Sequence, residues 1–110
     1  MNAARFIQAE ETFGNLIGLN PDFMEAWNKR ATVRYVLDDF NGSQDDINEV
    51  LSREPRHFGA LSGLGLINMQ RGDLKNAIRS YEKVLQISPF SQDALGLLPE
   101  LRKQLDKSNL

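Results

Sequence analysis

Apolar and polar residues follow a helical spacing along residues 73–87, DLKNAIRSYEKVLQI. The apolar residues recur every three or four positions, which is the spacing of one face of an amphipathic helix. Charged residues such as Lys75 and Arg79 fall on the opposite face. The segment therefore predicts a helix with a single apolar stripe, formed by Leu74, Ala77, Ile78, Tyr81, Val84 and Leu85.

The apolar pattern repeats along the chain with a period of 34 residues. Pro21, Pro55 and Pro89 are spaced by this period, and we call each such set of equivalent residues a column. A fixed period of this length indicates a repeated supersecondary unit. The columns in register with the prolines are Phe6, Phe40, Leu74; Ala9, Ser43, Ala77; Phe13, Ile47, Tyr81; Leu16, Val50, Val84; Ile17, Leu51, Leu85; Ala26, Ala60, Ala94; Trp27, Leu61, Leu95; and Ala31, Gly65, Pro99.

The periodicity and the turn residues between its segments predict six helices. Gly72 can adopt the left-handed conformation that ends a helix, and Asp73 can cap the next one; Asp38 and Asp39 hold the same places in the preceding copy. Pro99 falls inside the last segment, where we expect a kink or a restart. The predicted helices cover residues 3–19, 24–37, 40–53, 58–71, 74–87 and 92 to about 107.

The period and the order of small, aromatic and proline columns resemble the tetratricopeptide repeat, a helix-turn-helix unit that stacks into a solenoid. The resemblance implies an all-α fold, an α-solenoid of antiparallel helix pairs wound as a right-handed superhelix. It also implies one domain over residues 1–110. In that domain, residues 1–23 form the second helix of a partial repeat, residues 24–57 and 58–91 are full repeats, and residues 92–110 are a C-terminal capping helix.

Composition narrows the classes of function. The chain has 110 residues and a formal net charge of -2, and the lack of excess positive charge argues against nucleic acid as a partner. It has no cysteine, which excludes disulfides and thiolate metal sites. No apolar run approaches the ~20 residues of a membrane span. The start, MNAARFIQAEE, lacks the apolar core of a secretory signal. We therefore expect an intracellular protein, in the cytoplasm or an organelle, without membrane contact.

A glycine cluster at Gly59, Gly63, Gly65 and Gly72 raises the question of a phosphate-binding loop. Its spacing fits no nucleotide motif, and the repeat register places it within a helix. Gly65 shares a column with Ala31, where a side chain would hold two helices apart. Gly59 and Gly63 are either a tolerated cost to the helix or space for the backbone of a ligand.

Other candidate chemistry also finds little support. The acidic stretch 38–46, DDFNGSQDD, places Phe40 and Gly42 at calcium-ligand positions, so it is interpreted as a turn, a cap and a solvated helix face. His57 is the one histidine, and we expect it to be an exposed turn residue. The sequence thus predicts no catalytic residue, no cofactor and no metal site, hence a non-enzymatic protein.

Two residues of the first full repeat invite a closer interpretation. Trp27 shares a column with Leu61, so packing between helices explains it better than ligand stacking. Arg30 places a charge where the next copy has a leucine. We expect it to pair with an acidic neighbour such as Asp45 or Glu11, or to extend its head into water.

The family uses a concave face, lined by the first helix of each unit, to bind peptides or helices of partner proteins. By this resemblance the groove-facing residues are Glu25, Asn28, Thr32, Tyr35, Val36, Gly59, Ser62, Leu66, Met69 and Gln70. We take as partner-binding residues Asn28, Thr32, Tyr35, Ser62, Leu66, Met69 and Gln70, although each of these could simply face solvent.

One subgroup of the family clamps the acidic carboxyl-terminal tail of heat-shock chaperones with Lys, Asn and Arg side chains. The matching columns here carry Asn28, Thr32, Gly63, Asp93 and Leu97. Because no cationic pair occupies these columns, we expect no specific binding of such tails.

Two functions follow from these observations. In the first, the chain is an adaptor whose groove binds a peptide or helix of a protein partner. In the second, it is a structural or oligomerising segment of a larger protein. Its first helix lacks the helix that should precede it, and the chain could form a homo-oligomer through Phe6, Phe13 and Leu16.

Overall fold

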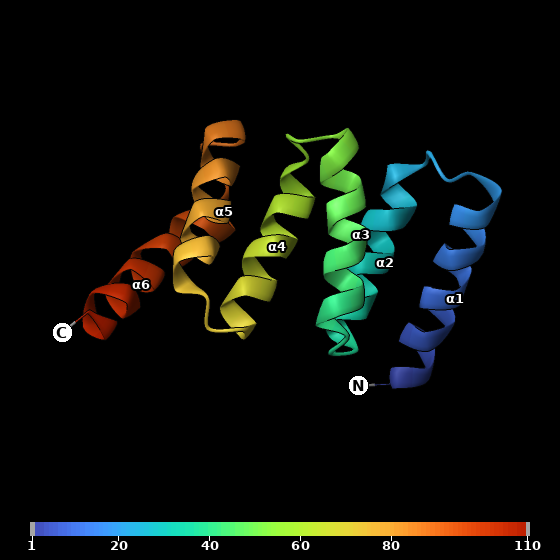
Figure 1. Ribbon diagram of the computed structural model, residues 1–110, viewed down its shortest axis with the longest axis horizontal. Coiled ribbons are helices and arrows are strands. Elements are labelled where there is room, and N and C mark those ends of the chain that lie inside the picture. The colour runs from blue at the N-terminus through green and yellow to red at the C-terminus, as the bar shows by residue number, and fades with distance from the viewer. Residues whose placement is uncertain (1, 110) are drawn as a thin grey trace. The chain divides into compact units, whose positions relative to one another are not determined.

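A computed structural model describes residues 2–109, and this part of the chain contains six α-helices and no strand (Figure 1). Three helices have the predicted bounds, α2 and α4 end one residue earlier than expected, and α6 extends one residue further. The helices are α1 (Ala3–Leu19), α2 (Met24–Val36), α3 (Phe40–Arg53), α4 (Phe58–Gln70), α5 (Leu74–Ile87) and α6 (Gln92–Ser108).

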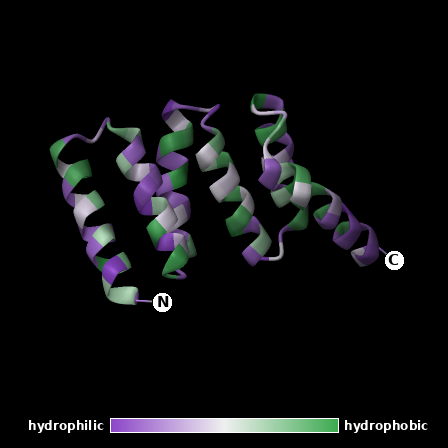
Figure 2. Cartoon of the chain, turned by 180° about the vertical axis from the view of Figure 1, so that it is seen from behind, coloured by the Kyte–Doolittle hydropathy of each residue, from purple (hydrophilic) through white to green (hydrophobic). Residues whose placement is uncertain are grey.

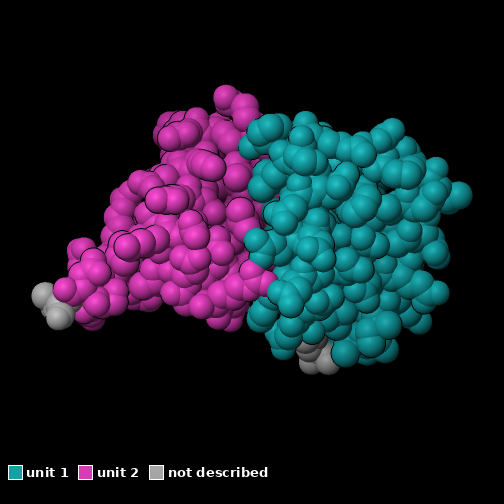
Figure 3. Space-filling model, in the orientation of Figure 1, with its two compact units in different colours: residues 1–55 teal, residues 56–110 magenta. Residues whose placement is uncertain are grey.

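The chain divides into two compact units (Figure 3): unit 1, residues 1–55, and unit 2, residues 56–110. In unit 1, α2 packs against both α1 and α3. The contact between α2 and α3 is close, because Ser43 Oγ donates a hydrogen bond to the carbonyl oxygen of Ala31 at 2.7 Å. The apolar core of this unit consists of Ile17, Met24, Ala26, Ala31, Val33, Ile47 and Val50.

In unit 2, α5 packs against both α4 and α6. Gly65 of α4 faces the buried ring of Tyr81 of α5, and a Cβ at Gly65 would lie 2.6 Å from Cε2 of that ring. The expectation that a side chain here would hold two helices apart is thereby confirmed. The core of unit 2 consists of Ala60, Leu61, Ile67, Ala77, Ile78, Tyr81, Val84, Ala94, Leu98 and Leu101.

Equivalent turns join the two helices of each full repeat. Asp38 and Gly72 have φ angles of 63° and 74°, so both adopt the predicted left-handed conformation. Asp39 Oδ1 then accepts a hydrogen bond from the backbone N–H of Gly42 at 3.0 Å, and Asp73 caps α5 in the same way. The predicted turn and cap are confirmed in both copies.

The structure corrects two local expectations. Helix α6 runs through Pro99 as one helix, so the expected restart is absent. The proline and Leu95, whose carbonyl loses its helical donor, are both exposed, so water can take the freed bond. His57 is half-buried rather than an exposed turn residue: its Nδ1 accepts a hydrogen bond from the backbone N–H of Ala60 at 3.0 Å and caps α4.

Candidate functional site

The predicted partner-binding residues of unit 1 lie on α2. Asn28, Thr32 and Tyr35 are spaced by four and three residues, which places them on one face of the helix. Thr32 is exposed, and its hydroxyl donates to the carbonyl oxygen of Asn28 at 3.2 Å. Tyr35 is half-buried, with its ring 5.5 Å from that of Phe40. This face of α2 therefore combines polar groups with one aromatic ring.

The predicted residues of unit 2 lie on α4 and have a different character. Leu66 is 36% exposed, Gln70 is exposed, and Ser62 and Met69 are half-buried. The whole sequence of α4, FGALSGLGLINMQ, contains no charged residue. Figure 2 accordingly colours most of α4 from white to green, whereas the end of α6 is purple. Phe58, at the start of α4, is 57% exposed and extends the apolar surface.

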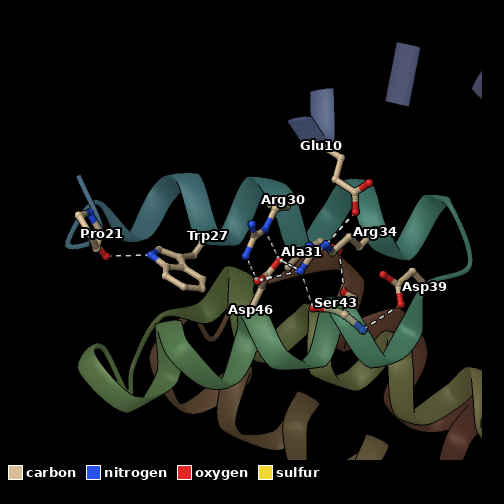
Figure 4. A network of polar contacts seen from close by, with 10 residues as sticks. Glu10, Pro21, Trp27, Arg30, Ala31, Arg34, Asp39, Ser43 and Asp46 are labelled. Atoms are coloured by element: carbon tan, nitrogen blue, oxygen red, sulfur yellow. Dashed lines mark hydrogen bonds and ion pairs between the residues drawn. The ribbon is translucent and has the colours of Figure 1, made fainter. Parts of the chain in front are cut away.

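A network of charges connects the three helices of unit 1 (Figure 4). Asp46 of α3 is 1% exposed and accepts hydrogen bonds from Arg30 Nη2 at 2.7 Å and from Arg34 Nη1 at 3.2 Å. Arg34 also donates through Nε to Glu10 of α1 at 2.8 Å. One buried carboxylate thus balances two guanidinium groups, and the second of these also binds a carboxylate on α1.

The partner of Arg30 differs from both expected residues. Its guanidinium binds Asp46 rather than Asp45 or Glu11. Asp45 is the neighbour of Asp46 in the sequence, but on a helix adjacent residues point about 100° apart, and Asp45 is exposed. The Arg30 guanidinium also lies 5.2 Å from the ring centroid of Trp27.

The surroundings of Arg34 and Trp27 are consistent with structural roles. Burial lowers the pKa of Arg34, but its hydrogen bond to Glu10 and the nearby carboxylates of Asp46 and Asp39 outweigh this effect and raise the pKa above its usual value. The guanidinium therefore stays charged at every ordinary pH. Trp27 donates its indole N–H to the carbonyl oxygen of Pro21 at 2.9 Å, which fixes the turn before α2.

Sequence reasoning missed this network, although a signal for it was present. Arg30, Arg34 and Asp46 occupy the columns in which the second full repeat has Leu64, Asn68 and Ser80. Two arginines one helical turn apart, with an aspartate in a facing column of the same repeat, mark a buried ion cluster. The network explains why α2 carries charges on its packed side.

The predicted oligomerisation residues of α1 are only partly covered. Leu16 is 39% exposed, and Phe6 and Phe13 are half-buried. In the full repeats the column of Leu16 is completely buried, at 0% exposure for both Val50 and Val84. The difference arises because α3 and α5 each pack against the first helix of their own repeat, whereas α1 packs against α2, the first helix of the next repeat.

Residues 2–109 contain no group of three or more His, Asp or Glu side chains arranged to hold a metal ion. No helix in this range combines the length and the apolar character that crossing a membrane requires.

Comparison with known sequences identifies relatives of the chain. It is 42% identical over 87 residues to a TPR repeat-containing protein of Rhizobium etli, a match that covers 76% of this chain and 43% of that protein. It is 25% identical over 109 residues to the small glutamine-rich tetratricopeptide repeat-containing protein 2 of Mycosarcoma maydis, covering 99% of this chain and 31% of that protein. The chain thus spans less than half the length of either relative.

Comparison with solved structures supports the same fold. The first TPR of Spaghetti (RPAP3), bound to the HSP90 peptide SRMEEVD, matches with a TM-score of 0.89 and 20% identity, covering 94% of this chain and 82% of that one. The first TPR domain of human RPAP3 has the same TM-score and identity and covers 96% and 84%. The predicted fold class, an all-α solenoid of antiparallel helix pairs, is confirmed.

The strongest evidence for the family is a sequence model of the tetratricopeptide repeat, which matches residues 28–92. This match contains the column residues from Ala31 to Pro89, which are all of those of the second full repeat and all of those of the first except Ala26 and Trp27. The chain therefore belongs to the tetratricopeptide repeat family.

Proposed function

We propose that this chain is a non-enzymatic, intracellular scaffold that binds another protein, with the exposed face of α4 in unit 2 and the exposed face of α2 in unit 1 each as a candidate contact. The predicted site residues share one face on each of these helices. Family membership supports a protein-binding role, and the absence of cysteine agrees with an intracellular location.

The observation that carries this proposal is the uncharged surface of α4. Soluble helices normally place charged residues on the side that faces water. Here Phe58 and Leu66 are exposed at 57% and 36%, with the half-buried Met69 near the end of the same helix. A methionine adapts its shape to different apolar partners, so this surface suits a segment with apolar side chains.

The face of α2 adds a different kind of contact. Asn28 and Thr32 carry amide and hydroxyl groups that can bond the backbone of a bound segment. The aromatic ring of Tyr35, which packs beside Phe40, supplies a rigid apolar edge on the same face. We therefore propose a partner segment with few charges.

The solved neighbour that binds an HSP90 peptide helps to define which class of ligand we propose for this chain. Its peptide, SRMEEVD, has three acidic residues. This chain has Asn28, Thr32, Gly63, Asp93 and Leu97 in the clamp columns, without a lysine or arginine among them. The proposed partner is accordingly a different class of ligand from an acidic tail.

Affinity capture with paired variants tests the proposal. The double variant Leu66→Ser, Met69→Ser removes the apolar side chains of α4, and Lys75→Ser, Arg79→Ser changes two exposed side chains of α5 as the matched control. Partners captured from cell extract are quantified by mass spectrometry, and circular dichroism verifies helicity. We expect the first variant alone to lose its specific partners, and unchanged capture by both would refute the proposal.

A second candidate function is self-association through α1. The observation that favours it is the exposure of large apolar residues on this helix, with Leu16 and Leu19 at 39% and 84% and Ile7, on another side of the helix, at 55%. Light scattering after gel filtration, at several protein concentrations, measures the oligomeric state. We expect an oligomer that Leu16→Glu dissociates, and a monomer at all concentrations would contradict this candidate.

A further inference from the structure

One stripe of α1 consists of Phe6, Ala9, Phe13 and Leu16, which we call the α1 seam. Its residues are spaced by three, four and three positions, the spacing of helices that pair side by side at a shallow angle. The seam runs over residues 6–16, or about 15 Å of helix. It is thus long enough to accommodate one facing helix.

The full repeats show how the equivalent stripe is normally covered. In the columns of Ala9 and Phe13, the residues of α3 and α5 are at most 1% exposed, whereas Ala9 and Phe13 themselves are half-buried. The covering helix runs antiparallel and places a small residue against a large one, as Gly65 does against Tyr81. A helix that packs on the α1 seam must therefore offer a small residue opposite Phe13.

The α1 seam itself meets this requirement. We propose that α1 pairs with α1 of a second copy, antiparallel and about a twofold axis. Reversing the seam places Ala9 of each copy opposite Phe13 of the other, and Phe6 opposite Leu16. Both ends of the contact are then equivalent, which is the property of a closed, isologous dimer.

The charges beside the seam are compatible with this contact. Glu10, the carboxylate beside Ala9, already binds Arg34 of its own chain at 2.8 Å. Two seams can therefore meet without bringing two unpaired carboxylates together. Thr12 has its hydroxyl bonded to the carbonyl oxygen of Gln8 at 3.0 Å, so it loses no hydrogen bond when water is displaced.

This inference rests on the second candidate function, self-association through α1, and adds the orientation and the facing residues. A substitution pair tests the small position. Ala9→Leu places a large side chain where Phe13 of the second copy would pack, and we expect it to weaken association by about tenfold or more. Ala4→Leu, at an exposed position of the same helix and off the seam, is the matched control and should leave association unchanged.

Cysteine cross-linking tests the orientation, because the natural chain has no cysteine. The single variants Ala9→Cys and Phe13→Cys are mixed and oxidised, with Ser52→Cys on the exposed side of α3 as the background control. An antiparallel seam predicts cross-links between position 9 and position 13 in excess of those between identical positions. Circular dichroism of each variant before oxidation verifies that the helices are intact.

The outcomes separate this inference from the candidate function on which it rests. If Leu16→Glu dissociates the dimer but identical positions cross-link preferentially, self-association through α1 is supported. The antiparallel arrangement of the seam is then refuted. A monomer in light scattering, with cross-linking no greater than that of Ser52→Cys, would overturn both.

Discussion

Replacement of Asp46 by alanine should be among the most destabilising single changes in unit 1. The carboxylate is 1% exposed and binds two guanidinium groups, through contacts of 2.7 and 3.0 Å to Arg30 and of 3.2 Å from each oxygen to Arg34. Removing it leaves two positive charges with low exposure, of which Arg34 keeps its hydrogen bond to Glu10. Breaking a buried ion pair in this way costs about 3–5 kcal/mol.

The cost should fall near the lower end of that range, at about 3 kcal/mol, because both arginines retain some access to water. Their side chains are 16% and 22% exposed, so their head groups can be partly rehydrated. Domains of this size are stable by about 5–15 kcal/mol, so the variant should lose a large fraction of its stability. The corresponding fall in Tm is about 10 °C or more.

Urea unfolding followed by tryptophan fluorescence measures this effect in the right part of the molecule. Trp27 is the one tryptophan of the chain, lies in unit 1 and stacks 5.2 Å from the Arg30 guanidinium. Circular dichroism followed in parallel shows whether the loss is confined to unit 1 or extends to the whole chain. A repeat array need not unfold in one step, so both signals are needed.

A triple variant patterned on the second full repeat provides the decisive comparison. Arg30→Leu, Arg34→Asn and Asp46→Ser together replace the charges with the residues found in the same columns of unit 2. It leaves no buried charge unpaired, because the one carboxylate that loses its partner, Glu10, has a side chain that is 31% exposed and can be hydrated. We therefore expect it to recover most of the stability that Asp46→Ala loses. A loss below about 1 kcal/mol for Asp46→Ala, or a triple variant no more stable than the single one, would refute this reasoning.

Three further predictions concern packing, turns and ligand choice. Gly65→Ala should lower the free energy of unfolding, measured in urea, by about 1–2 kcal/mol, because its Cβ would lie 2.6 Å from the ring of Tyr81. Gly96→Ala, which has open space around its Cβ, should raise the same free energy by about 0.5–1 kcal/mol. Asp38→Gly should stabilise the chain and Gly72→Ala destabilise it, each by about 1 kcal/mol in the same assay, since both positions have positive φ. An acidic heptapeptide with the sequence SRMEEVD should show no specific binding in isothermal titration calorimetry, and a micromolar affinity would contradict this.

The fold could be predicted well from the sequence because its determinants are local and repeated. Three helices begin and end at the predicted residues, since prolines, caps and left-handed positions recur in register. A left-handed residue such as Gly72, followed by the cap of Asp73, fixes a turn within a few positions of the chain. Repetition then makes each such signal count more than once.

The details that sequence reasoning missed depend on contacts between residues distant along the chain. The choice of Asp46 over Asp45 as the partner of Arg30 is decided by which side of α3 faces α2. His57 becomes a cap because its ring can reach the N–H of Ala60 once α4 has formed. Both outcomes require the three-dimensional arrangement, and column patterns alone do not contain it.

The two full repeats fill equivalent columns with opposite chemistry, and this contrast bears on function. Helix α2 directs two arginines into its packed side and keeps Thr32 on its exposed face, whereas α4 has no charge on any side. Core packing explains the apolar residues of α4 that are buried, such as Ile67 at 0% exposure, but it gives no reason for Phe58 and Leu66 to be apolar at 57% and 36%. Since charged residues at those exposed positions would cost the fold little, their absence is the observation on which the proposed contact between α4 and a partner rests.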